Sequence, residues 1–170
     1  REIEKIMKES KLELPDKIDP VSIRLFGAAL FWAEGSKKNM FDMTNSDPNL
    51  IVFWVKWLKI IFNINPEILK ARLNIYPQQS EKNIKKFWSK ITNIPVKNFG
   101  KTYVKPLSKN FKKNNLYYGT IRIEVPKSTN FRYKVLAWIQ KVLKSITHND
   151  AIMDRKWNRL REVAKPLKIK

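Results

Sequence analysis

The amino-acid sequence predicts an α+β fold, a mixed or antiparallel sheet of about four strands packed by helices. Segments with apolar residues at helical spacing alternate along the chain with short stretches in which polar and apolar residues alternate one by one. The chain has 170 residues and is 43% hydrophobic, which suits one compact domain with its own core. Neither a low-complexity block nor a convincing internal repeat interrupts this pattern.

Turn and capping residues set the order of the elements. Pro15 ends a charged first helix, and Asp19-Pro20 opens an apolar helix that stops at Gly35. The turn Asn45-Ser46-Asp47-Pro48 precedes another apolar helix. We expect helices over 2–12, 20–34, 50–62, 81–92 and 129–145, strands over 40–44, 72–76, 101–105 and 118–125, and a basic amphipathic segment over 150–164.

Three segments follow from this order. Residues 1–19 form an N-terminal helix and linker, 20–145 form the main domain, and 146–170 form a basic C-terminal helical extension. The extension either adds affinity for a polyanion or covers the core with its apolar residues, and the two roles are compatible.

Charge narrows the choice of partner. The chain carries 35 Lys and Arg against 15 Asp and Glu, a formal net charge of +20, so we expect it to bind a polyanion. No apolar run is long enough for a transmembrane helix and no segment resembles a signal peptide, which favours nucleic acid over a membrane and an intracellular location in cytoplasm, nucleoid or organelle. We expect no small-molecule cofactor.

Metal chemistry is limited by composition. With no Cys and one His, thiolate and histidine-rich zinc sites are excluded. A metal ion would need oxygen ligands, which points to magnesium or calcium.

The apolar helix over 20–34 ends in one carboxylate, Glu34. A carboxylate at a helix C-terminus opposes the helix dipole. Glu34 therefore either binds a metal ion or a cationic partner, or simply meets solvent at the end of a core helix. One face of this helix is apolar and includes two alanines that would let a second backbone approach closely; it contains Leu25, Ala29, Trp32, Ala33 and Ser36.

The polar faces of the strands form a candidate surface for reading DNA. Arginine can pair bidentately with guanine and asparagine with adenine in the major groove; the alternative is an ordinary solvated sheet face. The residues predicted on this face are Arg72, Asn74, Tyr76, Lys101, Tyr103, Lys105, Thr120 and Arg122. The loop over 108–115, with Lys109, Lys112 and Lys113, is either a phosphate clamp or a hairpin connection.

Helical spacing places a group of aromatic side chains in the core rather than on a base-stacking platform. These are Phe53, Trp54, Trp57, Trp88 and Trp138.

The segment Ala33-Glu34-Gly35 resembles the end of the motif that names the LAGLIDADG homing endonucleases. The order of motif helix, strand, helix, strand, further strand and closing helix is similar to that family's core over about residues 20–145, with 77–100 as an inserted helical excursion. The motif departs from the family pattern at Gly27, Ala29 and Trp32. The segments 32–37 and 44–48 resemble a subgroup of small bacterial and archaeal members.

The resemblance implies a LAGLIDADG-like fold with the motif helix at a dimer interface. Only one motif is visible, which implies a homodimer on a nearly palindromic site in double-stranded DNA. The interface would contain Leu25, Ala28, Ala29, Trp32 and Ala33. The implied activity is site-specific, Mg²⁺-dependent cleavage of both strands. A catalytically inactive transcription regulator and an RNA-binding maturase-like protein on the same fold are the alternatives.

The resemblance also assigns roles to residues near the motif. Glu34 would be the catalytic metal-binding acid, with Gly35 beside it in the metal site. Asn45 would position water, unless it is only a turn or capping residue. Lys127 would lie near the scissile phosphate, unless it is a solvated residue after Pro126. Lys37 and Lys38 would contact the DNA backbone, or serve as soluble turn residues.

Overall fold

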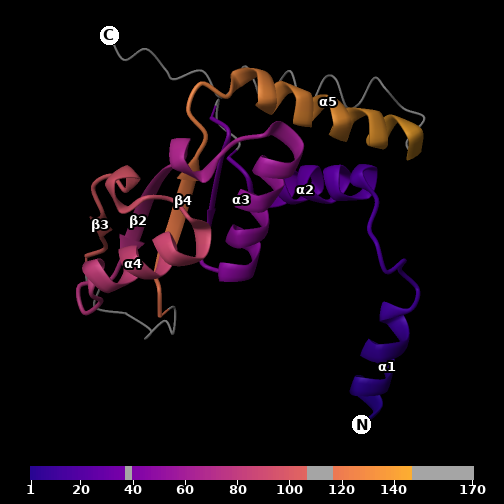
Figure 1. Ribbon diagram of the computed structural model, residues 1–170, viewed down its shortest axis with the longest axis horizontal. Helices are drawn as coiled ribbons and strands as arrows, with labels where there is room; N and C mark the ends of the chain where they lie inside the picture. Colours follow the sequence, from indigo (N-terminus) through magenta and orange to yellow (C-terminus); the bar gives the residue numbers. More distant parts are fainter. Residues whose placement is uncertain (37–39, 107–116, 147–170) are drawn as a thin grey trace.

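The computed structural model describes residues 1–36, 40–106 and 117–146 (Figure 1). These residues form helices α1 (Glu2–Lys11), α2 (Pro20–Glu34), α3 (Pro48–Phe62), α4 (Glu81–Thr92) and α5 (Thr129–Ile146), strands β1 (Asp42–Asn45), β2 (Lys70–Ile75), β3 (Tyr103–Val104) and β4 (Thr120–Glu124), and two short 3₁₀ helices, Pro66–Ile68 and Val96–Asn98. The predicted α+β class is therefore confirmed. The expected helix over 150–164 lies outside the described residues.

The four strands form one mixed sheet in the order β1-β4-β2-β3. Strand β4 is antiparallel to both of its neighbours, whereas β2 and β3 run parallel. In this register Arg122 lies opposite Thr44 on one side and Arg72 on the other. Every second side chain of the sheet thus faces the same polar surface.

The opposite face of the sheet is apolar and is covered by helices. Met43, Leu73 and Ile121 are fully buried there, and α2 and α3 pack against β1 while α5 packs against α2 (Figure 1). The indole rings of Trp54 and Trp57 stack with their centroids 5.1 Å apart. The described helices therefore pack on the apolar face of the sheet and not on its polar face.

Most of the predicted aromatic core is confirmed. Trp54, Trp57 and Trp88 are at most 1% exposed, and the Trp88 indole donates to the Tyr118 carbonyl at 2.9 Å. Phe53 and Trp138 are partly buried and pack against the rim of the core.

Some element boundaries differ from the sequence-based expectation. Strand β1 begins at Asp42 rather than at residue 40, and the strand expected over 101–105 shortens to Tyr103–Val104. The second difference arises because β3 pairs with β2 at two positions only, Asn74 and Ile75. Helix α2 ends before Gly35 as expected, but Gly35 is extended (φ −71°, ψ 163°) rather than left-handed.

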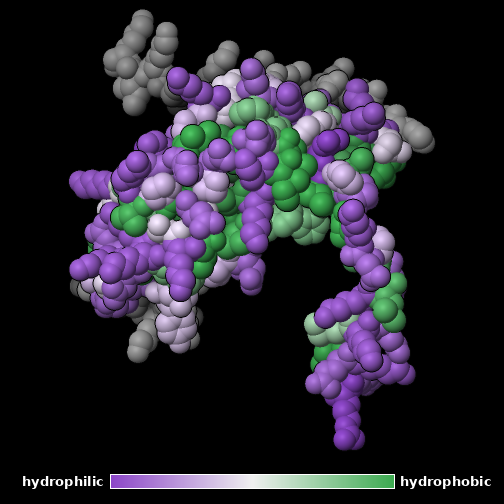
Figure 2. All heavy atoms as spheres, in the orientation of Figure 1, coloured by the Kyte–Doolittle hydropathy of each residue, from purple (hydrophilic) through white to green (hydrophobic). Residues whose placement is uncertain are grey.

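Helix α1 lies apart from the rest of the molecule, below the right-hand end of α2 in Figure 1. None of its residues is buried, and Figure 2 shows apolar side chains at its surface as well as over α2 and α3. Among the described helices, none is long and apolar enough to cross a membrane.

Candidate nucleic-acid interface

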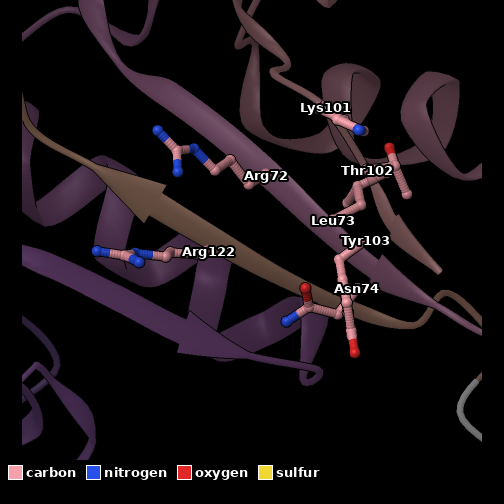
Figure 3. A pocket seen from close by; sticks show the side chains of 7 residues that line it. All are labelled: Arg72, Leu73, Asn74, Lys101, Thr102, Tyr103 and Arg122. Atoms are coloured by element: carbon pink, nitrogen blue, oxygen red, sulfur yellow. The ribbon is translucent and has the colours of Figure 1, made fainter. Parts of the chain in front are cut away.

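The polar face of the sheet brings most of the predicted DNA-reading residues together. A shallow pocket of about 430 Å³ opens over β2, β3 and β4 (Figure 3). Its lining residues are Arg72, Leu73, Asn74, Lys101, Thr102, Tyr103 and Arg122. Thr120 lies on the same face, directly opposite Asn74. The side chains around this pocket carry three cationic groups and several hydrogen-bonding groups, a composition that suits an anionic, acceptor-rich partner.

Two arginines lie side by side in this face. Arg72 and Arg122 are direct cross-strand neighbours, and Figure 3 shows both side chains extending in the same direction along the sheet. Like charges placed directly opposite each other destabilise a sheet. An acceptor from a phosphate or from a guanine edge would relieve that repulsion.

Arg122 has an internal partner. Its Nη2 donates to Asp42 Oδ2 at 2.6 Å, and the same nitrogen lies 3.3 Å from Met40 Sδ. The Asp42 side chain is only 5% exposed, whereas that of Arg122 is 34% exposed. Arg72 is exposed and forms no hydrogen bond or ion pair with any described residue. The two arginines therefore differ in how firmly they are held.

Acidic side chains also lie on this face. Glu124 is flanked across the strands by Asp42 and Lys70. The charge along the sheet is thus mixed: Asp42, Glu124 and Lys70 lie at one end, Arg72 and Arg122 lie in the middle, and Lys101 lies toward the other end. The middle of the face and the end near Lys101 therefore carry an excess of positive charge.

Helix α4 supports the rim of the pocket. Thr102 Oγ1 donates to Glu81 Oε1 at 2.8 Å, and Lys85 pairs with the same carboxylate oxygen at 2.6 Å. The hydrogen bond from Lys85 and then that from Thr102 hold the pKa of Glu81 below its ordinary value. The ionised Glu81 carboxylate thus holds the Thr102 hydroxyl and the Lys85 ammonium group together at this rim.

Further predicted contact residues lie at the edge of the face or beyond the described chain. Lys105 Nζ lies 5.0 Å from the centroid of the Tyr76 ring, a cation–π contact just past the ends of β2 and β3. The remaining predicted DNA-contacting lysines, Lys37, Lys38, Lys109, Lys112 and Lys113, lie outside the described residues.

The acidic end of α2 contacts the end of β1. Asn45 Nδ2 donates to the exposed Glu34 carboxylate at 3.2 Å. Asn45 Oδ1 accepts from the backbone N–H groups of Ser46 and Asp47 at 2.8 and 2.9 Å. Asn45 is therefore a turn residue, as the alternative interpretation held, and it also orients Glu34. Its amide thus bonds to one oxygen of the Glu34 carboxylate, Oε2.

Lys127 is not brought to this pair. It follows the end of β4 that pairs with Asp42, whereas Asn45 pairs with Ile121 at the other end of the β1–β4 ladder. Lys127 is exposed in a turn with a left-handed backbone, φ 50°. Within one protomer the described geometry supports its interpretation as a solvated turn residue.

Helix α2 exposes an apolar face that leads to Glu34. Val21, Leu25 and Trp32 are 55%, 37% and 43% exposed, and Ala29 and Ala33 are exposed on the same side of the helix. The resemblance also places Ala28 at the dimer interface, and the structure does not support this. Ala28 is 2% exposed and belongs to the core, so its side chain is used for packing within the protomer.

The described residues contain no group of three or more His, Cys, Asp or Glu side chains placed to share a metal ion. Glu34 brings one carboxylate, with the Gly35 backbone beside it. Carboxylate oxygens are ligands that Mg²⁺ prefers, and two Glu34 side chains meeting across a pair of α2 helices would supply more of them than one.

Asp42 is the residue of this site that the sequence analysis missed. It interrupts the apolar run Phe41-Asp42-Met43, and a carboxylate between two buried side chains is a signal for a buried ion pair. Its partner could not be inferred, because Arg122 is 80 residues away along the chain.

Comparison with known proteins does not identify the class of this protein. No protein-family model matches the chain, and neither a curated protein nor a solved structure matches it.

Proposed function

We propose that this chain is a homodimeric, site-specific DNA endonuclease with a LAGLIDADG-like fold. The observation that carries the proposal is the pair of arginines, Arg72 and Arg122, on the polar face of a sheet whose other face the described helices cover, in a chain of net charge +20. A twisted sheet can lie in the major groove of B-DNA, where arginine and asparagine distinguish bases and lysines contact phosphates.

Double-stranded DNA is favoured over double-stranded RNA by the shape of this surface. The major groove of A-form RNA is deep and too narrow for protein side chains to read. A reading face built on β2, β3 and β4 requires the wider groove of B-DNA.

The exposed face of α2 supports dimer formation. Two copies packed through Leu25, Ala29 and Trp32 would form an isologous interface and bring their Glu34 carboxylates close together. Each sheet would then read one half of a nearly palindromic site. Leu25 and Trp32 are 37% and 43% exposed in the single chain, and neighbouring exposed apolar side chains of this kind mark a protein contact.

The chemistry of cleavage would centre on Glu34. Bound magnesium would supply an activated water and stabilise the leaving oxygen of the phosphodiester. The chain's own contribution is to place Glu34 at the end of a rigid helix and to orient it through the Asn45 amide, 3.2 Å from the carboxylate. The helix dipole at this end repels an anion, which increases the affinity of Glu34 for a cation.

The proposal is tested with a randomised duplex library incubated with Mg²⁺ and the wild-type protein, Glu34→Gln or Glu67→Gln. Glu67 is exposed on a 3₁₀ helix away from α2 and is the matched control for loss of one negative charge. We expect discrete cut sites with wild type and Glu67→Gln, and none with Glu34→Gln.

Two other results separate the alternatives. Sequence-selective binding without cutting, equal in all three proteins, would indicate a DNA-binding regulator on the same fold. The observation that favours this second candidate is that the motif departs from the family pattern at Ala29 and Trp32. Absence of any duplex enrichment would contradict DNA binding itself.

A further inference from the structure

Asp42 is an unusual residue for its position. It lies in a strand at the edge of the sheet, between the buried side chains of Phe41 and Met43, and its own side chain is 5% exposed. A buried carboxylate is retained at a cost in stability unless it is paired. Its position on the polar face, diagonal to Arg122 across the β1–β4 ladder, shows that its carboxylate is directed toward the reading surface.

The ion pair with Asp42 restricts Arg122. One guanidinium nitrogen is held at 2.6 Å from Asp42 Oδ2 and contacts Met40 Sδ at 3.3 Å. The Nε atom is buried with no acceptor among the described residues. An arginine fork has five N–H donors; with Nη2 held by Asp42 and Met40 and Nε buried, the two on Nη1 remain for a ligand. Because the side chain is already fixed, less conformational entropy is lost when it binds one.

The neighbouring arginine provides a natural comparison. Arg72 occupies the equivalent position on β2 and lines the same pocket, but no described residue pairs with its guanidinium. A fixed guanidinium suits a base edge, where geometry decides which base is accepted. A side chain that can move suits a phosphate, whose position does not depend on sequence.

From these contacts we infer that Asp42 is a positioning residue for base recognition: it holds Arg122 so that the guanidinium reads one guanine in each half-site, while Arg72 contacts the DNA backbone. The inference rests on the proposed DNA-binding function and deepens it. Guanine presents O6 and N7 as paired acceptors in the major groove, the arrangement that an arginine fork matches best. Asp42 itself need not touch DNA.

The test is a binding selection from randomised duplexes at fixed salt, with wild type, Asp42→Asn, Arg122→Lys and Arg72→Lys. Arg122→Lys keeps the charge but loses the fork, and Arg72→Lys is the same change at the control position. We expect Arg122→Lys to reduce the preference for guanine at one half-site position by about 10-fold. Asp42→Asn should weaken the preference at that same position and at no other, and Arg72→Lys should change none.

A double variant tests whether the two changes act through the same contact, and a second Asp42 variant controls for loss of folding. The double variant Asp42→Asn/Arg122→Lys should show no greater loss of preference than Arg122→Lys alone, because both changes remove the same fixed fork. If Asp42→Asn fails to fold, Asp42→Glu, which keeps the charge on a longer side chain, should alter the preference at that same position. A merely structural role for Asp42 would instead weaken binding to all sequences equally.

The remaining outcomes of the binding selection distinguish failure of this inference from failure of the proposed function. Selective binding by the wild type with an unchanged base preference in both Asp42 variants would overturn this inference and leave the proposed function intact. A uniform loss of affinity in those variants would also overturn it. A wild-type protein that enriches no duplex would overturn the proposed function, and the inference with it.

Discussion

Gly27 shows how one residue fixes the packing of α2. A Cβ atom at this position would lie 2.1 Å from Nε1 of the buried Trp57, and that same nitrogen donates to the Ile23 carbonyl at 3.0 Å. The absence of a side chain thus lets α2 and α3 approach closely enough for the indole to bond to the helix backbone. The small residue serves packing within the protomer.

Replacing Gly27 by alanine should destabilise the fold. Trp57 is 1% exposed and cannot move away without disturbing the core, so we expect a loss of about 1–3 kcal/mol in the free energy of unfolding. Gly100→Ala is the control, because its Cβ would meet its nearest neighbour at 3.6 Å, an ordinary contact. Chemical denaturation of both variants measures the difference. Equal stability of the two variants would contradict the described packing.

Asp19 gives the start of α2 a pH-dependent stability. Its carboxylate accepts from the Ser22 hydroxyl and from the backbone N–H groups of Val21 and Ser22, and the first of these bonds contributes most to lowering its pKa below 3.8. A lowered folded-state pKa stabilises the fold above the unfolded-state value. That stabilisation is lost as pH falls through the folded-state value.

We therefore expect Asp19→Ala to lower the melting temperature at neutral pH, with the difference from wild type shrinking as the pH falls well below 3.8. Asp16→Ala removes an exposed carboxylate from the preceding linker and should leave the melting temperature unchanged. Thermal scans at several pH values check both. A difference that grows toward acid pH would exclude the capping role of Asp19.

At the scale of elements, α2 has two functions on two faces. One face packs Ala28 and Phe31 into the core. The other exposes an apolar stripe that leads to Glu34, and this stripe is the proposed contact between two copies.

Introducing a charge into this stripe should prevent pairing. Ala29→Arg would bring two like charges together across an isologous interface, which costs several kcal/mol, so we expect dimer affinity to fall by about 100-fold or more. Gln78→Arg adds the same charge to an exposed turn and should leave the dimer intact. Analytical ultracentrifugation in the presence of duplex DNA distinguishes the two variants. A monomeric wild type would rule out the proposed interface.

The sequence predicts elements well where a local period or cap defines them. Helix α4 was expected over 81–92 and forms at Glu81–Thr92, because Ile84 and Trp88 repeat at helical spacing and Ser80 caps its first turn. Strand β3 is shorter than its own residues predict. Its length depends on where the neighbouring strand β2 ends, which its own residues do not encode. The Asp42–Arg122 pair could not be predicted for the same reason: strand order depends on contacts between distant segments.

At the scale of the whole molecule, the described fold separates an apolar layer of helices from one polar sheet face. The formal charge of +20 would attract any polyanion. In the proposed function, the sheet would add the shape and the side chains that distinguish one duplex from another.

Salt dependence should report the phosphate contacts of this face. The affinity for duplex DNA should fall with salt, with a slope of about −0.9 per phosphate contact. Arg72→Ala removes one such contact in each protomer and should reduce the magnitude of the slope by about 0.9 per protomer. Glu67→Gln changes an exposed residue that does not line the pocket and should not change the slope. An unchanged slope in Arg72→Ala would show that Arg72 does not contact the backbone.

The most direct measurement is the symmetry of the site that the wild-type protein selects from a randomised duplex library. Two copies joined through α2, each reading bases with Asn74 and Arg122 and contacting the backbone with Arg72, predict two inverted half-sites at one fixed separation, bound by a dimer. A single unrepeated site bound by one copy, or no sequence preference at all, would contradict the account.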